Sequence, residues 1–448
     1  MLKTRLFAAG AALLSIQLPS CSFSASVETM LSPPRLTAEQ EQIYQALQAA
    51  AGSSVRLKYP RSGERRSAFT VEDLDGDGAD EAIAFYEVSL TAADDNPLRL
   101  CLLAQKNGKW SAVSDYPTAG AEIERIEVGT LGSNPRTNLI VSYHLVDGGD
   151  HTAEVYHLED GGLIRSLSVP YTMLTLRDLN GNGETELFSV TSAKLPNPAS
   201  AAVYSLDSAG QYLTSQINLP ESCTEVSRLV CGVIPQEKPG AEPVPAFYID
   251  GSAGPTTAQT AVLSYADRKL TLIYADSPDH IQNTTRPAFC QTFDIDGDGE
   301  AEIPVQAVFY GYSAESQVPQ PAMTNWYVVR NGLLMRERSS YYSTAGGYAF
   351  LMPARWERRV TAVQENDEIV FYEFDSAAKS EDGAPVLKSP LLRLAAVTDA
   401  VTAETMQEDG YVLLRQTGGT CYLARRLNTG HSLALTDGEL ITAMCYFT

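Results

Sequence analysis

The sequence predicts a mainly β protein built from repeated units, and three observations support this prediction. Short apolar runs alternate with Gly- and Pro-containing turns from about residue 54 to residue 345. Tight-turn sequences recur at intervals of about 50 to 65 residues, and an acidic nine-residue pattern recurs at about twice that interval. A chain of 448 residues with 44% apolar residues is long enough to divide its core among several units.

The first twenty residues have the features of a secretory signal. Lys3 and Arg5 precede an apolar segment, 6–18, which is too short to span a bilayer but matches the apolar region of a signal peptide. The sequence Leu18-Pro19-Ser20-Cys21 resembles the bacterial lipobox, in which the cysteine becomes the lipidated N-terminus. We therefore expect residues 1–20 to be removed and Cys21 to carry a lipid. The alternative is an ordinary secretory signal in which Cys21 has no special role.

This N-terminus predicts where the protein lies. Residues 21–35 are polar and Ser-rich, which suits a tether between a lipid and a folded body. We expect an extracytoplasmic protein, lipid-anchored to the bacterial cell membrane, because no other stretch is apolar enough for a transmembrane helix. The formal net charge of −22 excludes nucleic acid as a partner, since phosphate backbones are bound by basic surfaces.

One helix is predicted over residues 36–53. Thr37 can cap it, with Gln40 three residues later as in a capping box. Ile43 and Leu47 share one face at helical spacing, and Gly52 can end the helix.

From residue 54 to residue 345, five units each contain a strand, a tight turn and a second strand. Two of the turns contain Asn-Gly, the strongest short hairpin signal. The five turns are Lys106-Asn107-Gly108, Asp160-Gly161-Gly162, Ser208-Ala209-Gly210, Ala266-Asp267-Arg268 and Arg330-Asn331-Gly332. With two further strands each, these units have four strands in about 50–60 residues, which is typical of β-propeller blades. We therefore predict a propeller of five clear blades, with the possibility of more.

Three acidic loops lie half a unit before these turns, 105 and 116 residues apart. Aspartates at positions 1, 3 and 5 converge if the loop curls around one point, Gly at position 6 permits the bend, and Glu at position 9 completes the group. Hard oxygen ligands in this number favour Ca²⁺ over Zn²⁺ or Cu²⁺. The candidate ligands are Asp73, Asp75, Asp77 and Glu81, then Asp178, Asn180, Asn182 and Glu186, then Asp294, Asp296, Asp298 and Glu302.

The second loop carries two asparagines in place of aspartates, so we expect it to bind calcium more weakly. The intervening units hold divergent copies. Residues 128–141 align position by position with residues 71–84 but lack the carboxylates, and the segment after Val230 keeps only its flanking strands.

Acidic loops of this form between strands, in repeats of this length, resemble the FG-GAP/VCBS repeats of integrin-α-type propellers. The resemblance covers about residues 54–345. It implies a propeller with calcium in its inter-strand loops and an extracellular binding surface rather than one fixed chemistry. Members of this family usually close with seven blades, so the blade number stays open here.

The last part of the chain, residues 350–448, has no acidic loop and predicts a smaller, β-rich α+β unit. Its expected strands end before a short closing helix over 437–447, capped by Thr436. One or two divergent blades are the alternative. Among the cysteines after Cys21, only Cys223 and Cys231 are close in sequence, and both a disulfide and buried thiols are compatible with that spacing.

The sequence favours a binding or adhesion module for a glycan or a surface protein, with no catalytic residues. It contains no G-x-S-x-G, H-E-x-x-H or phosphate-loop motif. A secreted glycan-degrading enzyme, either a polysaccharide lyase or a hydrolase on the same scaffold, is the main alternative, and a purely structural envelope lipoprotein is another. Four tyrosines of the fifth unit could stack on sugar rings or simply pack between strands: Tyr310, Tyr312, Tyr341 and Tyr342.

Overall fold

The structure is a computed structural model, and it describes residues 36–447 except for 53–54, 88–96, 146–150, 237–239, 314–315, 317 and 379. Cys21, the candidate lipidation site, lies outside these residues, as do the predicted signal and tether. In the described part of the chain, no helix has the length and apolarity needed to cross a membrane.

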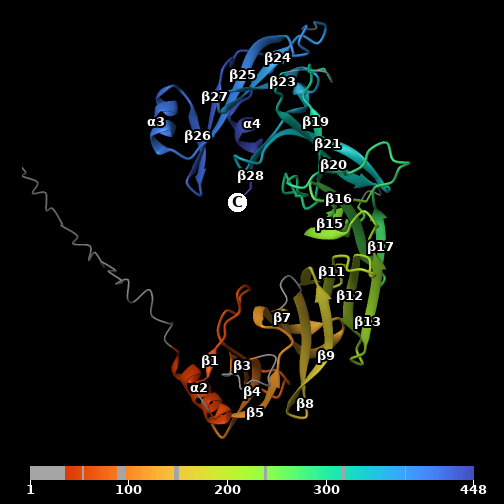
Figure 1. Cartoon of the computed structure of the whole chain (residues 1–448), viewed down its shortest axis with the longest axis vertical. Helices are drawn as coiled ribbons and strands as arrows, with labels where there is room; N and C mark the ends of the chain where they lie inside the picture. Colours follow the sequence, from red (N-terminus) through yellow and green to blue (C-terminus); the bar gives the residue numbers. More distant parts are fainter. Residues whose placement is uncertain are drawn as a thin grey trace, which may run out of the picture.

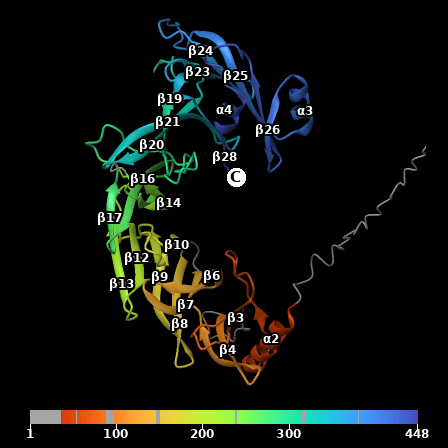
Figure 2. The same ribbon diagram turned by 180° about the vertical axis from the view of Figure 1, so that it is seen from behind.

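Six antiparallel sheets, numbered one to six along the chain, form the body of the molecule (Figures 1 and 2). The first sheet contains β1 (Arg56–Leu57), β2 (Phe69–Glu72), β3 (Glu81–Glu87), β4 (Leu98–Lys106) and β5 (Lys109–Pro117). The second contains β6 (Glu122–Leu131), β7 (Asn134–His144), β8 (His151–Glu159) and β9 (Gly162–Tyr171). The third contains β10 (Met173–Arg177), β11 (Glu186–Thr191), β12 (Ser200–Leu206) and β13 (Tyr212–Asn218).

The later sheets each have five strands. The fourth contains β14 (Glu225–Ile234), β15 (Val244–Gly254), β16 (Thr257–Ala266), β17 (Lys269–Tyr274) and β18 (Arg286–Pro287). The fifth contains β19 (Ile303–Val308), β20 (Ala322–Arg330), β21 (Leu333–Ser343), β22 (Tyr348–Leu351) and β28 (Met444–Tyr446). The sixth contains β23 (Val360–Glu365), β24 (Glu368–Phe374), β25 (Leu387–Val397), β26 (Val412–Thr417) and β27 (Thr420–Arg426).

All five predicted turns connect consecutive, paired strands of one sheet: β4 to β5, β8 to β9, β12 to β13, β16 to β17 and β20 to β21. Left-handed residues stand in these turns, including Asn107 (φ 53°), Asp160 (φ 51°) and Asn331 (φ 52°). Two-residue turns with positive φ match the right-handed twist of the paired strands. The mainly β class and the four-stranded antiparallel units are therefore confirmed.

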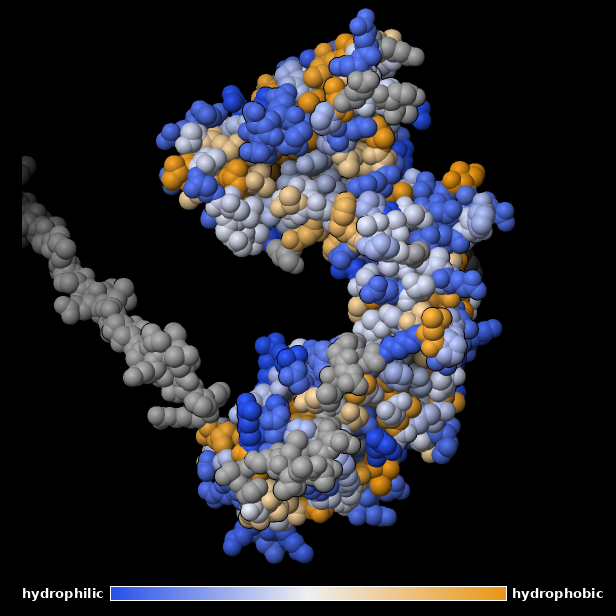
Figure 3. All heavy atoms as spheres, viewed as in Figure 1, coloured by the Kyte–Doolittle hydropathy of each residue, from blue (hydrophilic) through white to orange (hydrophobic). Residues whose placement is uncertain are grey.

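The sheets stack face to face along an open arc. A separate apolar core fills each of the five spaces between consecutive sheets. The first strands β10 and β14 lie toward the concave side, and the fourth strands β13 and β17 lie toward the convex side (Figure 2). Figure 3 shows a wide hollow between the two arms of the arc, so the described residues do not close into a ring.

A helix covers the outer face of the sheet at each end of the arc. Helix α2 (Ala38–Ala51) buries Ile43 and Leu47 completely against the first sheet, and Thr37 and Gln40 form the predicted capping box. Helix α3 (Ala400–Glu408) packs Ala403 against the sixth sheet, and Asp399 caps it. Repeat arrays need such caps because a terminal repeat has no neighbour to cover its apolar face.

The last hundred residues share a sheet and a core with the repeats before them. The predicted closing helix is shorter than expected: α4 (Asp437–Thr442) has the Thr436 capping box, but the chain then forms β28, which pairs with β22 through Phe350 and Met444. The core between the fifth and sixth sheets includes Trp326 and Phe371. The expected boundary near residue 350 therefore runs through one continuous sheet and its core.

Candidate metal sites and adjoining cavities

The three acidic loops occupy the same register position in the first, third and fifth sheets. In each, the Glu at position 9 pairs across the strands with the residue just before the loop: Glu72 with Glu81, Arg177 with Glu186, and Phe293 with Glu302. The Glu side chain then accepts a hydrogen bond from the backbone N–H of loop position 2, at 3.0, 2.9 and 2.8 Å respectively. The loops are therefore one structural motif, as their sequences predict.

The loop 294–302 groups three carboxylates around one point. Oxygens of Asp294, Asp296 and Glu302 all lie within 4.8 Å of one another. The Asp294 carboxylate accepts backbone hydrogen bonds from Gly297 (2.7 Å) and Gly299 (3.0 Å), which have positive φ angles of 80° and 92°. Glycine permits this backbone conformation at little cost, and the tight curl brings the carboxylates together.

Two oxygens of this group are buried without a hydrogen-bond partner among the described residues: Oδ1 of Asp296 and Oε1 of Glu302. Glu302 is fully buried, and burial together with Asp296, Asp298 and Asp294 raises its pKa to about 8. Burial of a carboxylate without a compensating partner is costly. A cation among these oxygens would supply the missing partner, so the residues present fit a hard divalent cation such as Ca²⁺.

The loop 73–81 has a similar group in a more exposed place. Oxygens of Asp73, Asp75 and Glu81 lie within 4.8 Å of one another, and Asp75 is exposed. Burial raises the pKa of Glu81, and the neighbouring aspartates raise it further. Asp77, which the sequence also predicted as a ligand, is not part of this group, and its carboxylate accepts a hydrogen bond from the Ala79 N–H (2.7 Å). Asp298 occupies the same position in the loop 294–302 and accepts from Glu300.

The loop 178–186 satisfies its own buried glutamate. The Asn180 amide donates to Oε1 of Glu186 at 3.2 Å, the oxygen whose counterpart in Glu302 is unpartnered. Asn182 accepts from the Glu184 N–H at 2.8 Å. Burial works to raise the pKa of Asp178, but four backbone N–H groups outweigh it and lower that pKa. In this loop the Asn180 amide therefore supplies the partner for the buried glutamate that a cation would supply in the loop 294–302.

The second sheet keeps the register of the acidic loops without their carboxylates, and the fourth holds a buried ion pair at a different place, well inside β15. In the second, Val128 pairs with Leu139 as Val71 pairs with Ala82, so the predicted alignment of the divergent copy is correct in register. In the fourth, the buried Asp250 on β15 forms an ion pair with the buried Arg286 at 2.7 Å. The sequence gives no motif for this pair, because the two residues are far apart along the chain.

Two of the acidic loops also contact the preceding sheet through their backbone. The Gly132 N–H donates to the Thr185 carbonyl at 2.7 Å, and the Val233 N–H donates to the Gly299 carbonyl at 3.0 Å. The loops 178–186 and 294–302 therefore help to set the spacing between neighbouring sheets, and an ion in them would stabilise these contacts as well as the loop.

The other predicted features have structural roles in the described residues. Cys223 and Cys231 are free thiols, as are the four other described cysteines. Burial raises the pKa of Cys223 to about 11, which suits an unreactive thiol. Tyr341 and Tyr342 pack against the core between the fifth and sixth sheets, and the Tyr312 hydroxyl donates to the Ala362 carbonyl. These three tyrosines therefore contribute to packing.

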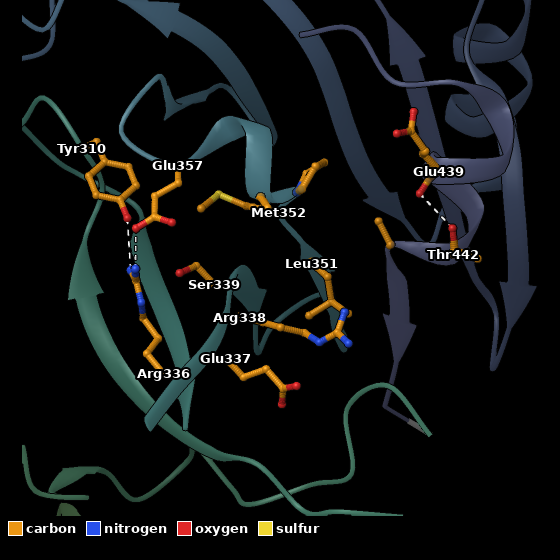
Figure 4. Close-up of a pocket in the computed structure, with 13 residues that line it drawn as sticks. Tyr310, Arg336, Glu337, Arg338, Ser339, Leu351, Met352, Glu357, Glu439 and Thr442 are labelled. Atoms are coloured by element: carbon orange, nitrogen blue, oxygen red, sulfur yellow. Dashed lines mark hydrogen bonds and ion pairs between the residues drawn. The ribbon is translucent and has the colours of Figure 1, made fainter. Parts of the chain in front are cut away.

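Two adjoining cavities border the fifth sheet, and the sequence did not predict them. The larger, about 1090 Å³, lies beside the loop 294–302 and is also lined by Arg228, Arg338 and Arg415. The smaller, about 600 Å³, is lined by Tyr310 and Arg336, which donates to the Tyr310 hydroxyl at 3.2 Å and pairs with Glu357 (Figure 4). The dispersed arginines follow no sequence pattern, and only the fold brings them together.

Comparisons with known proteins identify no family. No family model matches the sequence, and no curated protein matches it. Among solved structures, the chain is similar to the exotype rhamnogalacturonan lyase YesX, with 10% identity, a TM-score of 0.28 and 75% of each chain covered.

Two further solved structures are similar to the same extent. One is the β-propeller domain of the Trilobed protease from Pyrococcus furiosus, described as having an open velcro topology (10% identity, TM-score 0.23, 74% of this chain and 89% of that chain). The other is the Penicillium chrysogenum alpha-L-arabinanase complexed with arabinobiose (12% identity, TM-score 0.24, 76% and 98%). TM-scores this low support no statement about the fold or function of this chain.

Proposed function

We propose that this protein is an extracytoplasmic, lipid-anchored binding module whose sheets are the blades of an open propeller stabilised by calcium. Its partner is a glycan or a surface protein. Cys21 supplies the membrane anchor, and the loops 73–81 and 294–302 supply the stronger calcium sites.

The observation that carries this proposal is the pair of unpartnered, buried carboxylate oxygens in the loop 294–302. One loop glutamate is completely buried beside two aspartates, and the described chain offers no donor to its second oxygen. Calcium takes six to eight oxygen ligands and commonly binds extracellular modules with a Kd of about 10⁻⁴–10⁻³ M. The calcium concentration outside cells suits sites of that strength, which agrees with the secretory signal that the sequence predicts.

The arc supports a binding role because it presents a large concave surface with cavities along it. Ligands bind preferentially in concave places with a few convergent polar groups. An ion held by the carboxylates of the loop 294–302 would also stabilise the contact of that loop with the fourth sheet, through the Val233 N–H and the Gly299 carbonyl.

A glycan array probed with and without calcium tests the binding role. We expect the protein to bind a glycan or a surface protein. EDTA should lower both the affinity for that partner and the melting temperature. Binding to no glycan and no surface protein, under conditions where calcium stabilises the fold, would contradict it. For the anchor, Cys21→Ala should move the protein from the membrane fraction to the soluble fraction; a wild-type protein that is already soluble and carries no lipid would refute that part.

A second function, glycan cleavage, is favoured by one specific observation. Tyr310, Arg336 and Glu357 meet in the smaller cavity, where a guanidinium contacts both a phenol and a carboxylate (Figure 4). A phenol held by a cation can serve as an acid or base in glycan cleavage. Tyr310→Phe should then abolish product formation from a bound glycan while leaving its affinity unchanged. A folded wild-type protein that binds a glycan and releases no product would exclude this function.

A further inference from the structure

The larger cavity collects arginines from three different sheets. Arg228 comes from β14 of the fourth sheet, Arg338 from β21 of the fifth, and Arg415 from β26 of the sixth. The residues after α4, including β28, complete the wall. β14, β28 and the C-terminus lie on the concave side of the arc (Figures 1 and 2). The cavity is therefore on the surface that a large ligand would meet.

Two of these arginines are held by aromatic rings and not by carboxylates. The Arg228 guanidinium lies 4.2 Å from the centre of the Phe293 ring. It also donates to the Thr292 carbonyl (2.9 Å) and to Oε1 of Gln291 (3.1 Å), which leaves its Nη2 group without a hydrogen-bond partner in the described part of the chain. The Arg415 guanidinium lies 4.8 Å from the centre of the Tyr446 ring. Within the described residues, neither has an ion-pair partner. Stacking fixes the plane of a guanidinium and leaves N–H donors for another acceptor.

The third arginine connects the cavity to the acidic loop. Arg338 forms an ion pair with Asp296, whose side chain is 13% exposed, and it lies beside Asp294 and Asp298 in the same wall. Three arginines thus face three aspartates, which leaves the wall close to neutral. A divalent cation held by the loop makes this wall positive, in a chain whose formal net charge is −22.

We propose that this cavity binds the carboxylate groups of an acidic oligosaccharide built from uronic acids, with Arg228 and Arg415 as the residues that bind its carboxylates. The inference rests on the proposed function, because a cation in the loop 294–302 is needed to offset the aspartates. Arginine recognises carboxylate with two parallel N–H donors, and ring stacking preorganises both guanidinium groups for that contact.

The lining of the site favours a carbohydrate chain over an acidic peptide. Arg338, Leu351 and Thr442 line both cavities, so the two adjoin; Figure 4 shows these three residues in the smaller cavity. Its walls offer side-chain hydroxyl, amide and carboxylate groups such as Thr442, Gln291 and Glu337, which match sugar hydroxyls. The strand at its border, β28, has three residues, which is too short to template an added peptide strand.

Calorimetric titration of the full chain with trigalacturonate tests the inference. In calcium we expect saturable binding, which should disappear with the neutral trisaccharide whose carboxylates are reduced to alcohols. Arg415→Gln should weaken binding by on the order of tenfold to a hundredfold, the usual range for a lost hydrogen bond to a charged group. Arg425→Gln is the matched control, because Arg425 also stacks on a tyrosine, Tyr411, but does not line the cavity.

Arg228→Gln should weaken binding similarly. Because Arg228 also contacts backbone, Arg228→Lys provides a second variant, which keeps the charge and loses the bidentate geometry; it should weaken binding less. Melting temperatures and circular dichroism of each variant establish that it is folded.

The outcomes separate this inference from the proposed function. If terbium luminescence shows ion binding by the loop but trigalacturonate does not bind, the inference is wrong and the calcium module stands. If a glutamate-rich peptide binds with the same dependence on Arg415 and trigalacturonate does not, the occupant is a peptide and the inference is also overturned. If neither terbium nor calcium binds and EDTA leaves the melting temperature unchanged, the proposed function itself fails.

Discussion

Asp250 in the fourth sheet and Glu302 in the fifth are both buried carboxylates, but their surroundings differ. Asp250 has the Arg286 guanidinium at 2.7 Å and also accepts hydrogen bonds from Thr260 and Thr292. Glu302 has one backbone donor, Ile295, and an unpartnered second oxygen. In the fourth sheet the Arg286 side chain thus supplies the positive charge beside the buried carboxylate. In the fifth sheet the acidic loop offers a site for a cation from solution.

The acidic loops lie in the first, third and fifth sheets. Two of the sheets that lack them have stabilising contacts that need no metal: an ion pair in the fourth, and in the second a turn in which Gly132 lies close to the Leu206 carbonyl of the third sheet. Stability should therefore depend on calcium in the first and fifth sheets, only weakly in the third, and not in the second and fourth. Three substitutions test this division, in order of decreasing expected effect.

Arg286→Met should cause the largest loss, because it leaves Asp250 buried without its cation. Breaking a buried ion pair by removing one partner typically costs about 3–5 kcal/mol. Denaturant titration should show this loss equally with calcium and with EDTA. Lys269→Met, at an exposed position of the same sheet, is the control and should have little effect. A loss of stability that appears only in EDTA would show that the contribution of Arg286 depends on calcium. This would contradict the contrast drawn between Asp250 and Glu302.

Asp296→Ala should remove most of the calcium-dependent stability of the fifth sheet. An ion that binds only the folded state adds about 2.7 kcal/mol at a hundredfold excess over its Kd. The gain in melting temperature on adding calcium should shrink in this variant. It should be nearly unchanged in Asn180→Ala, because in the wild-type loop the Asn180 amide, and not an ion, is the partner of Glu186, so this loop adds little to that gain. Equal effects of the two variants would contradict the ranking of the loops.

Gly132→Ala should destabilise the contact between the second and third sheets. The residue has a φ of 55°, and an added Cβ would lie 2.2 Å from the Leu206 carbonyl oxygen. Strain of this kind costs about 1–3 kcal/mol. Gly129→Ala is the matched control, since a Cβ there has open space around it. A folded Gly132→Ala protein with wild-type stability would show that the two sheets are not held by this contact.

The sequence predicted the features that depend on contacts between residues close together in the chain. Turns such as Asn107-Gly108 and Asn331-Gly332 require positive φ, and they appear where expected because few residues tolerate it. The capping box of Thr37 and Gln40 and the register of the acidic loops follow from short-range hydrogen bonds, which nearby residues specify.

Features that depend on distant contacts were missed or mispredicted. Residues 444–446 follow a helix and would extend it locally, but pairing with β22 makes them a strand. Helix α3 escaped prediction because Ala403 is its only buried residue, so it has almost no apolar periodicity. The gathering of Arg228, Arg338 and Arg415 around one cavity depends on how three sheets stack, which no sequence pattern encodes.

The central claim is that the acidic loops of the first and fifth sheets hold calcium. Equilibrium dialysis with radioactive calcium, on protein first freed of metal by chelation, tests it most directly. We expect about two ions per chain in the stronger class, one for each group of three carboxylates, with the loop 178–186 filling only at higher concentration. Asp75→Asn and Asp296→Asn should each remove one of these two ions. Absence of binding at millimolar calcium, or a stoichiometry that neither variant changes, would contradict the claim.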